Sequence, residues 1–126
     1  MQILKGVGRL KFSNPYLTEK EKIELLSKWI IIQSLIYYEY DSNLVSDETY
    51  DHNSKAFLEL ILVHPEVFKS SKYYHILHDF KGSGYYIHSR LNDKEAKEYE
   101  NLINYVLKLQ RSKGAKEKWK NKEKLK

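Results

Sequence analysis

Residues 37–51 read YYEYDSNLVSDETYD, and this stretch decides how we expect the chain to fold. It holds four tyrosines and three aspartates, and an apolar segment lies on each side of it. Within it, Asp41-Ser42-Asn43 supplies the small polar residues that favour a turn. The sequence therefore predicts two helices that meet at a corner between residues 40 and 46.

The segment before the corner has the pattern of a helix from Thr18 to about Tyr40. Thr18 and Glu21 form a capping box, in which the Thr18 hydroxyl accepts from a first-turn amide and Glu21 reaches back. The run 29–32 is rich in β-branched residues and could form a strand, but the cap and the length of the pattern favour a helix. We expect its buried face to hold Ile23, Leu26, Ile30 and Ile36, widened by Leu25, Trp29 and Ile32.

Three further helices are expected after the corner. Ser46 caps the first of them, with two acidic residues in its first turn, and Pro65 marks its end. A shorter helix follows Ser70 or Ser71 and ends before Gly82, and its apolar residues are Tyr73, Tyr74, Ile76, Leu77 and Phe80. After an extended piece at 85–91 the last helix starts at Asn92 or Asp93. The predicted buried residues are Tyr50, Ala56, Phe57, Leu60 and Ile61 in the first, and Tyr99, Leu102, Ile103, Val106 and Leu109 in the last.

The fold class that follows is mostly α. We expect a small bundle of about four helices in one domain over residues 1–110, with a short extended arm at residues 1–12 and a flexible basic tail at 111–126. A chain of 126 residues with 41% hydrophobic residues is large enough to form one core.

Composition excludes several kinds of protein. The chain has no cysteine, so a disulfide framework and a thiolate metal site are excluded. No run approaches about 20 apolar residues, and the first residues lack the apolar core of a signal peptide, so we expect a cytoplasmic protein with no membrane partner. His75, His78 and Asp79 could touch one metal, but without a ligand from a second segment we expect no metal site.

The corner also predicts a binding site. Asp47, Tyr50 and Asp51 are spaced i, i+3 and i+4, which places them on one face of one helical turn. A short turn would bring them close to Tyr37 and Tyr38 at the end of the preceding helix. Two rings can flank a flat heterocycle, and carboxylates can accept hydrogen bonds from ribose hydroxyls or an amide. Helix capping and core packing are the alternative explanation for the same residues.

The full pattern resembles a known family. YYEYDSNLVSDETYD is followed by His64-Pro65-Glu66, and the whole is similar to the helical N-terminal subdomain of bacterial NAD-dependent DNA ligases over about residues 20–70. In those ligases the subdomain clasps the nicotinamide mononucleotide half of NAD. The resemblance implies that the rings of Tyr37, Tyr38 and Tyr50 pack on nicotinamide, and that Asp47 and Asp51 meet the ribose hydroxyls and the carboxamide.

The departures from the family exclude ligase activity. The nucleophile motif Lys-x-Asp-Gly is absent, and the nearest text, residues 81–84, lacks the Asp. Ser70-Ser71-Lys72-Tyr73 replaces the usual Asp-Ser-Pro-Thr, and Thr49 replaces a common Glu. The chain looks like the small free-standing phage relatives of this subdomain, so we expect no enzyme activity.

Two functions stay open at this point. The first is a non-catalytic binding protein that takes NAD or nicotinamide mononucleotide weakly and needs no cofactor. The second is a phage-encoded inhibitor of a host defence or replication protein, of the anti-CRISPR type, that acts through protein–protein contacts. Small size and many tyrosines favour the second, because tyrosines anchor interfaces well.

The basic charge is confined to residues 111–126, which hold eight Lys or Arg and two Glu. The other residues hold 14 basic and 15 acidic side chains, so the body is almost neutral. A segment of this kind is either a solvated end or a hook for nucleic acid. We favour the solvated end.

If the tail does bind nucleic acid, binding should be indifferent to base sequence, because lysines neutralise phosphates without reading bases. About four to six contacted phosphates would give a log–log salt slope of roughly −4 to −5 on duplex DNA. Fluorescence anisotropy with a labelled duplex, on the full chain and on a truncation after Gln110, measures this. An unchanged affinity and slope after truncation would show that the tail is a solvated end.

Overall fold

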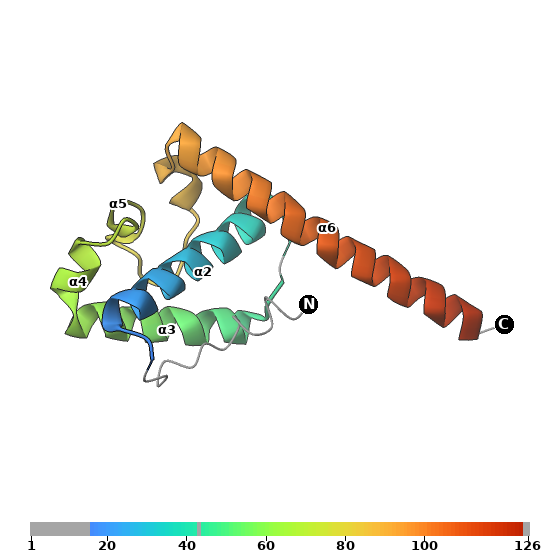
Figure 1. The fold of residues 1–126 in the computed structure, drawn as a ribbon, viewed down its shortest axis with the longest axis horizontal. Helices are drawn as coiled ribbons and strands as arrows, with labels where there is room; N and C mark the ends of the chain where they lie inside the picture. The colour runs from blue at the N-terminus through green and yellow to red at the C-terminus, as the bar shows by residue number, and fades with distance from the viewer. Residues whose placement is uncertain (1–15, 43, 125–126) are drawn as a thin grey trace.

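The computed structural model describes residues 16–42 and 44–124, and every regular element in these ranges is a helix. This confirms the expected small, mostly helical bundle (Figure 1). The expected extended arm at residues 1–12 lies outside the described residues. The elements in chain order are α2 (Glu19–Glu39), α3 (Asp47–Val63), α4 (Pro65–Lys69), α5 (Tyr74–Leu77), the 3-10 helix η1 (Ile87–Arg90) and α6 (Asp93–Lys124).

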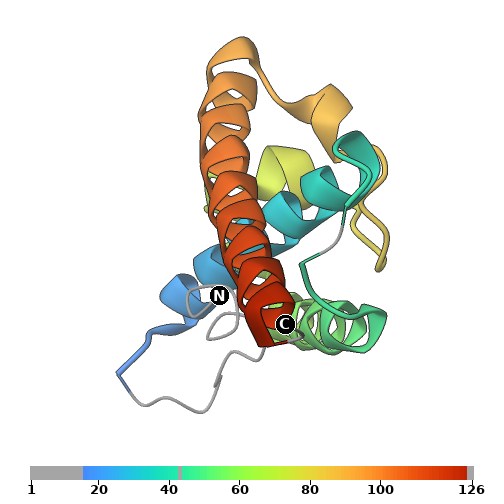
Figure 2. The same cartoon turned by 90° about the vertical axis from the view of Figure 1, so that its right-hand side faces the viewer.

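Helix α2 is the centre of the fold. It contacts α3, α4, η1 and α6, and it lies between α3 and the first half of α6 (Figures 1 and 2). Because it is covered on several sides, residues 29–32 are helical although they are rich in β-branched residues. Leu25 is 39% exposed, so its expected place on the buried face is wrong. The buried apolar residues of α2 are Ile23, Leu26, Trp29, Ile30, Ile31, Leu35 and Ile36.

The predicted helix starts are confirmed by their caps. The Glu21 amide donates to Thr18 Oγ1 at 3.1 Å, and the Thr18 amide donates to Glu21 Oε1 at 3.2 Å. At the start of α3, the Thr49 amide donates to Ser46 Oγ at 3.1 Å. These bonds satisfy amides that have no partner inside their own helix, and they fix where α2 and α3 begin.

The chain between α3 and α6 differs from the prediction. Pro65 does follow the end of α3, but it also opens α4, because its fixed φ angle suits a first helical position. The helix expected after Ser70 or Ser71 is reduced to the four residues of α5. Residues 85–91 are not extended but contain η1, where Ile87 is fully buried and Arg90 Nη1 donates to the Ile76 carbonyl at 3.0 Å. These two tertiary contacts hold η1 against the core.

Helix α6 starts as predicted, with Asn92 Oδ1 accepting from the Glu95 amide at 2.8 Å. Its buried residues include Ile103 and Leu107, whereas Leu109 is 39% exposed and was wrongly assigned to the core. The helix continues to Lys124, about 48 Å in all, and extends past the other helices (Figure 1). The flexibility of residues 111–126 stays a prediction. In the described ranges neither α6 nor any other helix combines the length and apolar character that a membrane span requires.

Candidate functional site

The corner between α2 and α3 is closed by the backbone. Asp41 has a φ angle of 48°, in the left-handed region that Asp tolerates better than most residues. The Ser42 amide then donates to the Ile36 carbonyl at 3.2 Å, which satisfies a carbonyl in the last turn of α2. The end of α2 and the start of α3 are therefore held close together.

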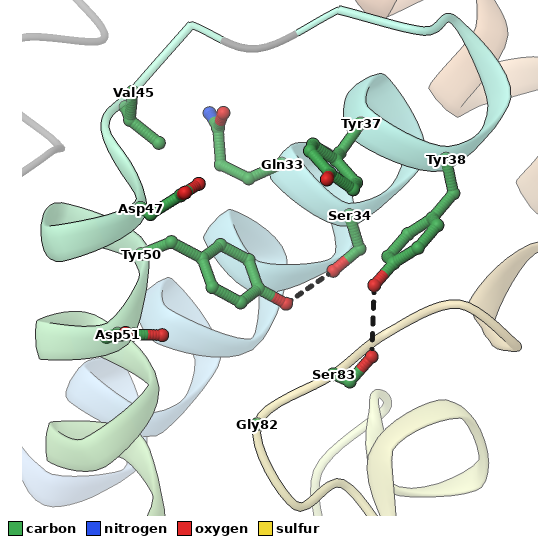
Figure 3. A pocket seen from close by; sticks show the side chains of 10 residues that line it. All are labelled: Gln33, Ser34, Tyr37, Tyr38, Val45, Asp47, Tyr50, Asp51, Gly82 and Ser83. Atoms are coloured by element: carbon green, nitrogen blue, oxygen red, sulfur yellow. Dashed lines mark hydrogen bonds between the residues drawn. The ribbon is translucent and has the colours of Figure 1, made fainter.

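All five residues predicted for the site line one cavity of about 350 Å³ at this corner (Figure 3). They come from the last turn of α2 and the first turns of α3. The sequence did not indicate the other five lining residues. Three of them lie in α2 or just before α3, and two lie in the loop at residues 82–84. The complete lining is Gln33, Ser34, Tyr37, Tyr38, Val45, Asp47, Tyr50, Asp51, Gly82 and Ser83.

Two tyrosines form the rim of the cavity. Tyr37 is 53% exposed and Tyr38 is 44% exposed, and their rings meet edge to face with centroids 4.9 Å apart. The Tyr38 hydroxyl shares a hydrogen bond of 3.0 Å with Ser83 Oγ. Core packing, the alternative explanation from the sequence, does not account for two rings that are about half exposed.

Tyr50 lines the cavity and also has a structural role. Its hydroxyl shares a hydrogen bond of 2.8 Å with Ser34 Oγ, and its ring lies 5.9 Å from that of Trp29. Burial raises the pKa of the Tyr50 hydroxyl, although the bond to Ser34 acts in the opposite direction. The side chain is therefore neutral at physiological pH and joins α3 to α2.

The two carboxylates give the cavity its charge. Asp47 and Asp51 lie one turn apart and are exposed. No lysine, arginine or histidine is among the described residues that line the cavity. Ser46 supplies the side-chain cap of α3, and Asp47 in the first turn also suits the positive end of that helix. The cavity thus favours neutral or cationic groups and hydrogen-bond donors.

Gln33 and Ser34 are the two buried polar residues among the described residues that line the cavity, and Gln33 is the one without a hydrogen bond. It is only 4% exposed, and its Nε2 has no hydrogen-bond partner among the described residues. Its side chain leaves α2 and points toward Val45 and Asp47 (Figure 3). A buried donor without a partner costs about 1–3 kcal/mol, and Gln33 shares this property with Trp29 Nε1 of the same helix. Gln33 differs from Trp29 in that it lines the cavity.

The loop at residues 82–84 forms the remaining wall. Gly82 has a φ angle of 112°, which residues with a side chain rarely adopt. A Cβ atom at Gly84 would lie only 2.3 Å from Ser34 Oγ, so glycine is required for this close approach. The loop therefore packs closely against α2 at Ser34, the residue that also bonds Tyr50.

The histidine cluster considered as a metal site has other contacts. His75 Nε2 lies 3.0 Å from Glu95 Oε2, and Arg90 Nη2 donates to Asp79 Oδ2 at 2.8 Å. The hydrogen bond from Arg90 holds the pKa of the Asp79 carboxyl at about 2. Within residues 16–42 and 44–124 no group of three or more metal-ligating side chains is assembled.

Comparisons with known proteins add no relative. No protein-family model matches the sequence, and neither a curated protein nor a solved structure gives a significant match. The resemblance to the ligase subdomain therefore stays a prediction, and the geometry of the cavity carries the functional argument.

The loop wall gives a test of stability. Gly84→Ala places a methyl group against Ser34 and should lower the free energy of unfolding by about 1–3 kcal/mol, as other overpacking substitutions do. Urea unfolding followed by circular dichroism measures the change. Ser83→Ala is the control in the same loop, with an expected change of about 0.5 kcal/mol or less because Ser83 is exposed. Equal stability of Gly84→Ala and the native protein would contradict the close approach.

Proposed function

We propose that this protein is a non-catalytic binding protein whose cavity takes a nicotinamide nucleotide. The observation that carries the proposal is the convergence of Tyr37, Tyr38, Asp47, Tyr50 and Asp51 on one cavity. The sequence pattern of the ligase subdomain implicates the same five residues. Two independent lines of argument, a resemblance in sequence and a cavity in the structure, thus lead to the same residues.

The rim tyrosines suit a flat ring. Tyr37 and Tyr38 leave about half of their surface exposed, and a bound heterocycle would bury part of it. Aromatic rings favour offset or edge-to-face contacts with other rings, and they also attract cations. The oxidised nicotinamide ring is both flat and positively charged, so both effects favour it.

The carboxylates suit the rest of the nucleoside. Asp47 and Asp51 can accept hydrogen bonds from ribose hydroxyls or from a carboxamide N–H. Since the described lining contains no basic side chain, their charge is also available to a cationic ring. A phosphate group has the wrong sign for this cavity and should stay outside it.

The cavity size limits the ligand and its affinity. A volume of about 350 Å³ is at the lower end of the usual range for ligand sites, about 300–1,000 Å³. Nicotinamide and ribose therefore suit it better than a whole dinucleotide. Because the contact area is small, we expect a dissociation constant on the order of 0.1–1 mM.

The binding prediction is tested by ligand-observed NMR or isothermal titration with nicotinamide mononucleotide and NAD. Asp51→Asn keeps the shape of the side chain and removes its charge, so it should weaken binding about fivefold to tenfold. Glu59→Gln is the matched control, because Glu59 is exposed on the same helix and does not line the cavity. No binding at millimolar ligand by a folded protein would overturn the proposal.

A second candidate function is the inhibition of a host protein through a protein interface. The observation that favours it is the exposure of tyrosines away from the cavity: Tyr16 is 89%, Tyr85 70% and Tyr105 59% exposed. Exposed tyrosines supply interface area at a low entropic cost. Such an interface would not require the cavity residues.

A pull-down from a bacterial host lysate separates the two candidates. The bait is the native protein, and the control is the Tyr37→Ala/Asp51→Ala double variant. One stoichiometric partner that both baits recover would favour the inhibitor. If no partner is recovered while nicotinamide mononucleotide binds the native protein, the ligand-binding function is favoured.

A further inference from the structure

Gln33 is the cavity residue that neither the sequence pattern nor the fold requires. Most of the other buried residues of α2 are apolar, and an apolar residue at this position would leave no donor unpaired. A buried N–H group without a partner is rare in folded proteins. The cost is offset if a ligand supplies the missing acceptor.

Gln33 differs from the other polar residues of the cavity in the kind of hydrogen-bond donor that it carries. In the pairs Ser34–Tyr50 and Tyr38–Ser83 one hydroxyl donates to the other, and the accepting hydroxyl keeps its own O–H. The two carboxylates accept hydrogen bonds and cannot donate them when ionised. Among the ten described lining residues, Gln33 is the only one whose side chain carries an N–H donor.

The position of Gln33 sets where an acceptor would bind. The side chain projects from α2 toward Val45 and Asp47, between the rim tyrosines and the start of α3 (Figure 3). A ring substituent that reaches the Gln33 amide has to enter the part of the cavity beside Val45 and Asp47. A carbonyl oxygen can accept from one of the two N–H groups of this amide.

We propose that Gln33 is a specificity-determining residue, whose buried amide donates a hydrogen bond to a carbonyl oxygen on the ring of the ligand. The ligand class is then a neutral or cationic flat ring with a carbonyl substituent. A carboxamide fits best, because its carbonyl accepts from Gln33 while its NH₂ group donates to a carboxylate of the cavity. This inference rests on the proposed function and names the group by which the ligand is selected.

The experiment compares two ligands that differ by an acetyl group on the ring: 3-acetylpyridine mononucleotide and pyridine mononucleotide. The methyl group adds to the native ratio as well, so the change of this ratio on substitution of Gln33 is what reports the hydrogen bond. The acetyl group has the carbonyl oxygen but no NH₂, so the comparison excludes any bond from NH₂ to Asp47 or Asp51. For the native protein, the carbonyl ligand should bind about tenfold more tightly, which corresponds to one hydrogen bond to a buried donor.

The variant is Gln33→Met, which has a similar length and no N–H donor. The ratio of the two dissociation constants should fall from about ten to below about three, because the acceptor has lost its partner. The melting temperature should be unchanged or higher, since an unpaired buried donor is removed. Gln110→Met, on the exposed surface of α6, is the control and should keep the native ratio.

The outcomes separate this inference from the proposed function. If neither nicotinamide mononucleotide nor the acetyl ligand binds the native protein, both the proposed function and the role of Gln33 are wrong. If both bind and Gln33→Met keeps the ratio at about ten, the binding function holds and the role of Gln33 is wrong. A Gln33→Met variant with a clearly lower melting temperature and an unchanged ratio would show that Gln33 is structural.

Discussion

The contact between Ser34 of α2 and the chain at Gly84 is the constraint on which the cavity depends. Ser34 has a small side chain, and a Cβ atom at Gly84 would approach its Oγ to 2.3 Å, so the loop reaches α2 only because one partner is serine and the other is glycine. The same Ser34 hydroxyl bonds Tyr50 of α3 at 2.8 Å. Three segments therefore meet at Ser34, and these segments form the walls of the cavity.

The central position of α2 explains why the cavity can be built at its end. Its buried apolar residues face α3, α4, η1 and α6, so the helix is held firmly from several sides. In its second half, however, Gln33 and Ser34 are buried and polar. Polar residues in the most buried helix of a small protein cost stability, and such costs are typical of functional positions.

Local signals in the sequence were sufficient for the parts of the fold that local chemistry determines. The capping box at Thr18, the cap at Ser46 and the turn residues after Tyr40 predicted α2, the corner and α3. The spacing of Asp47, Tyr50 and Asp51 also indicated correctly that they share one face close to the end of α2. Ligand binding by these residues stays a prediction.

The remaining features depend on contacts between distant segments, which no local pattern records. η1 depends on the burial of Ile87 and on a hydrogen bond from Arg90 to the Ile76 carbonyl. Because neither contact is local, the sequence of residues 85–91 alone predicts an extended segment. In α6, Leu107 is buried and Leu109 is not, because Leu107 shares a helix face with the buried Ile103. The sequence does not indicate Gln33 as a cavity residue, because its neighbours in the cavity come from other segments of the chain.

The central claim is that the α2–α3 corner and the loop at 82–84 form one nicotinamide-nucleotide site. The most direct measurement is a two-dimensional ¹H–¹⁵N NMR titration of the labelled protein with nicotinamide mononucleotide, which locates the site on the chain. The account predicts that the amide signals that shift belong to residues 33–38, 45–51 and 82–84, and that those of 97–109 on α6 stay in place. Shifts confined to α6, or spread without relation to the cavity, would contradict it.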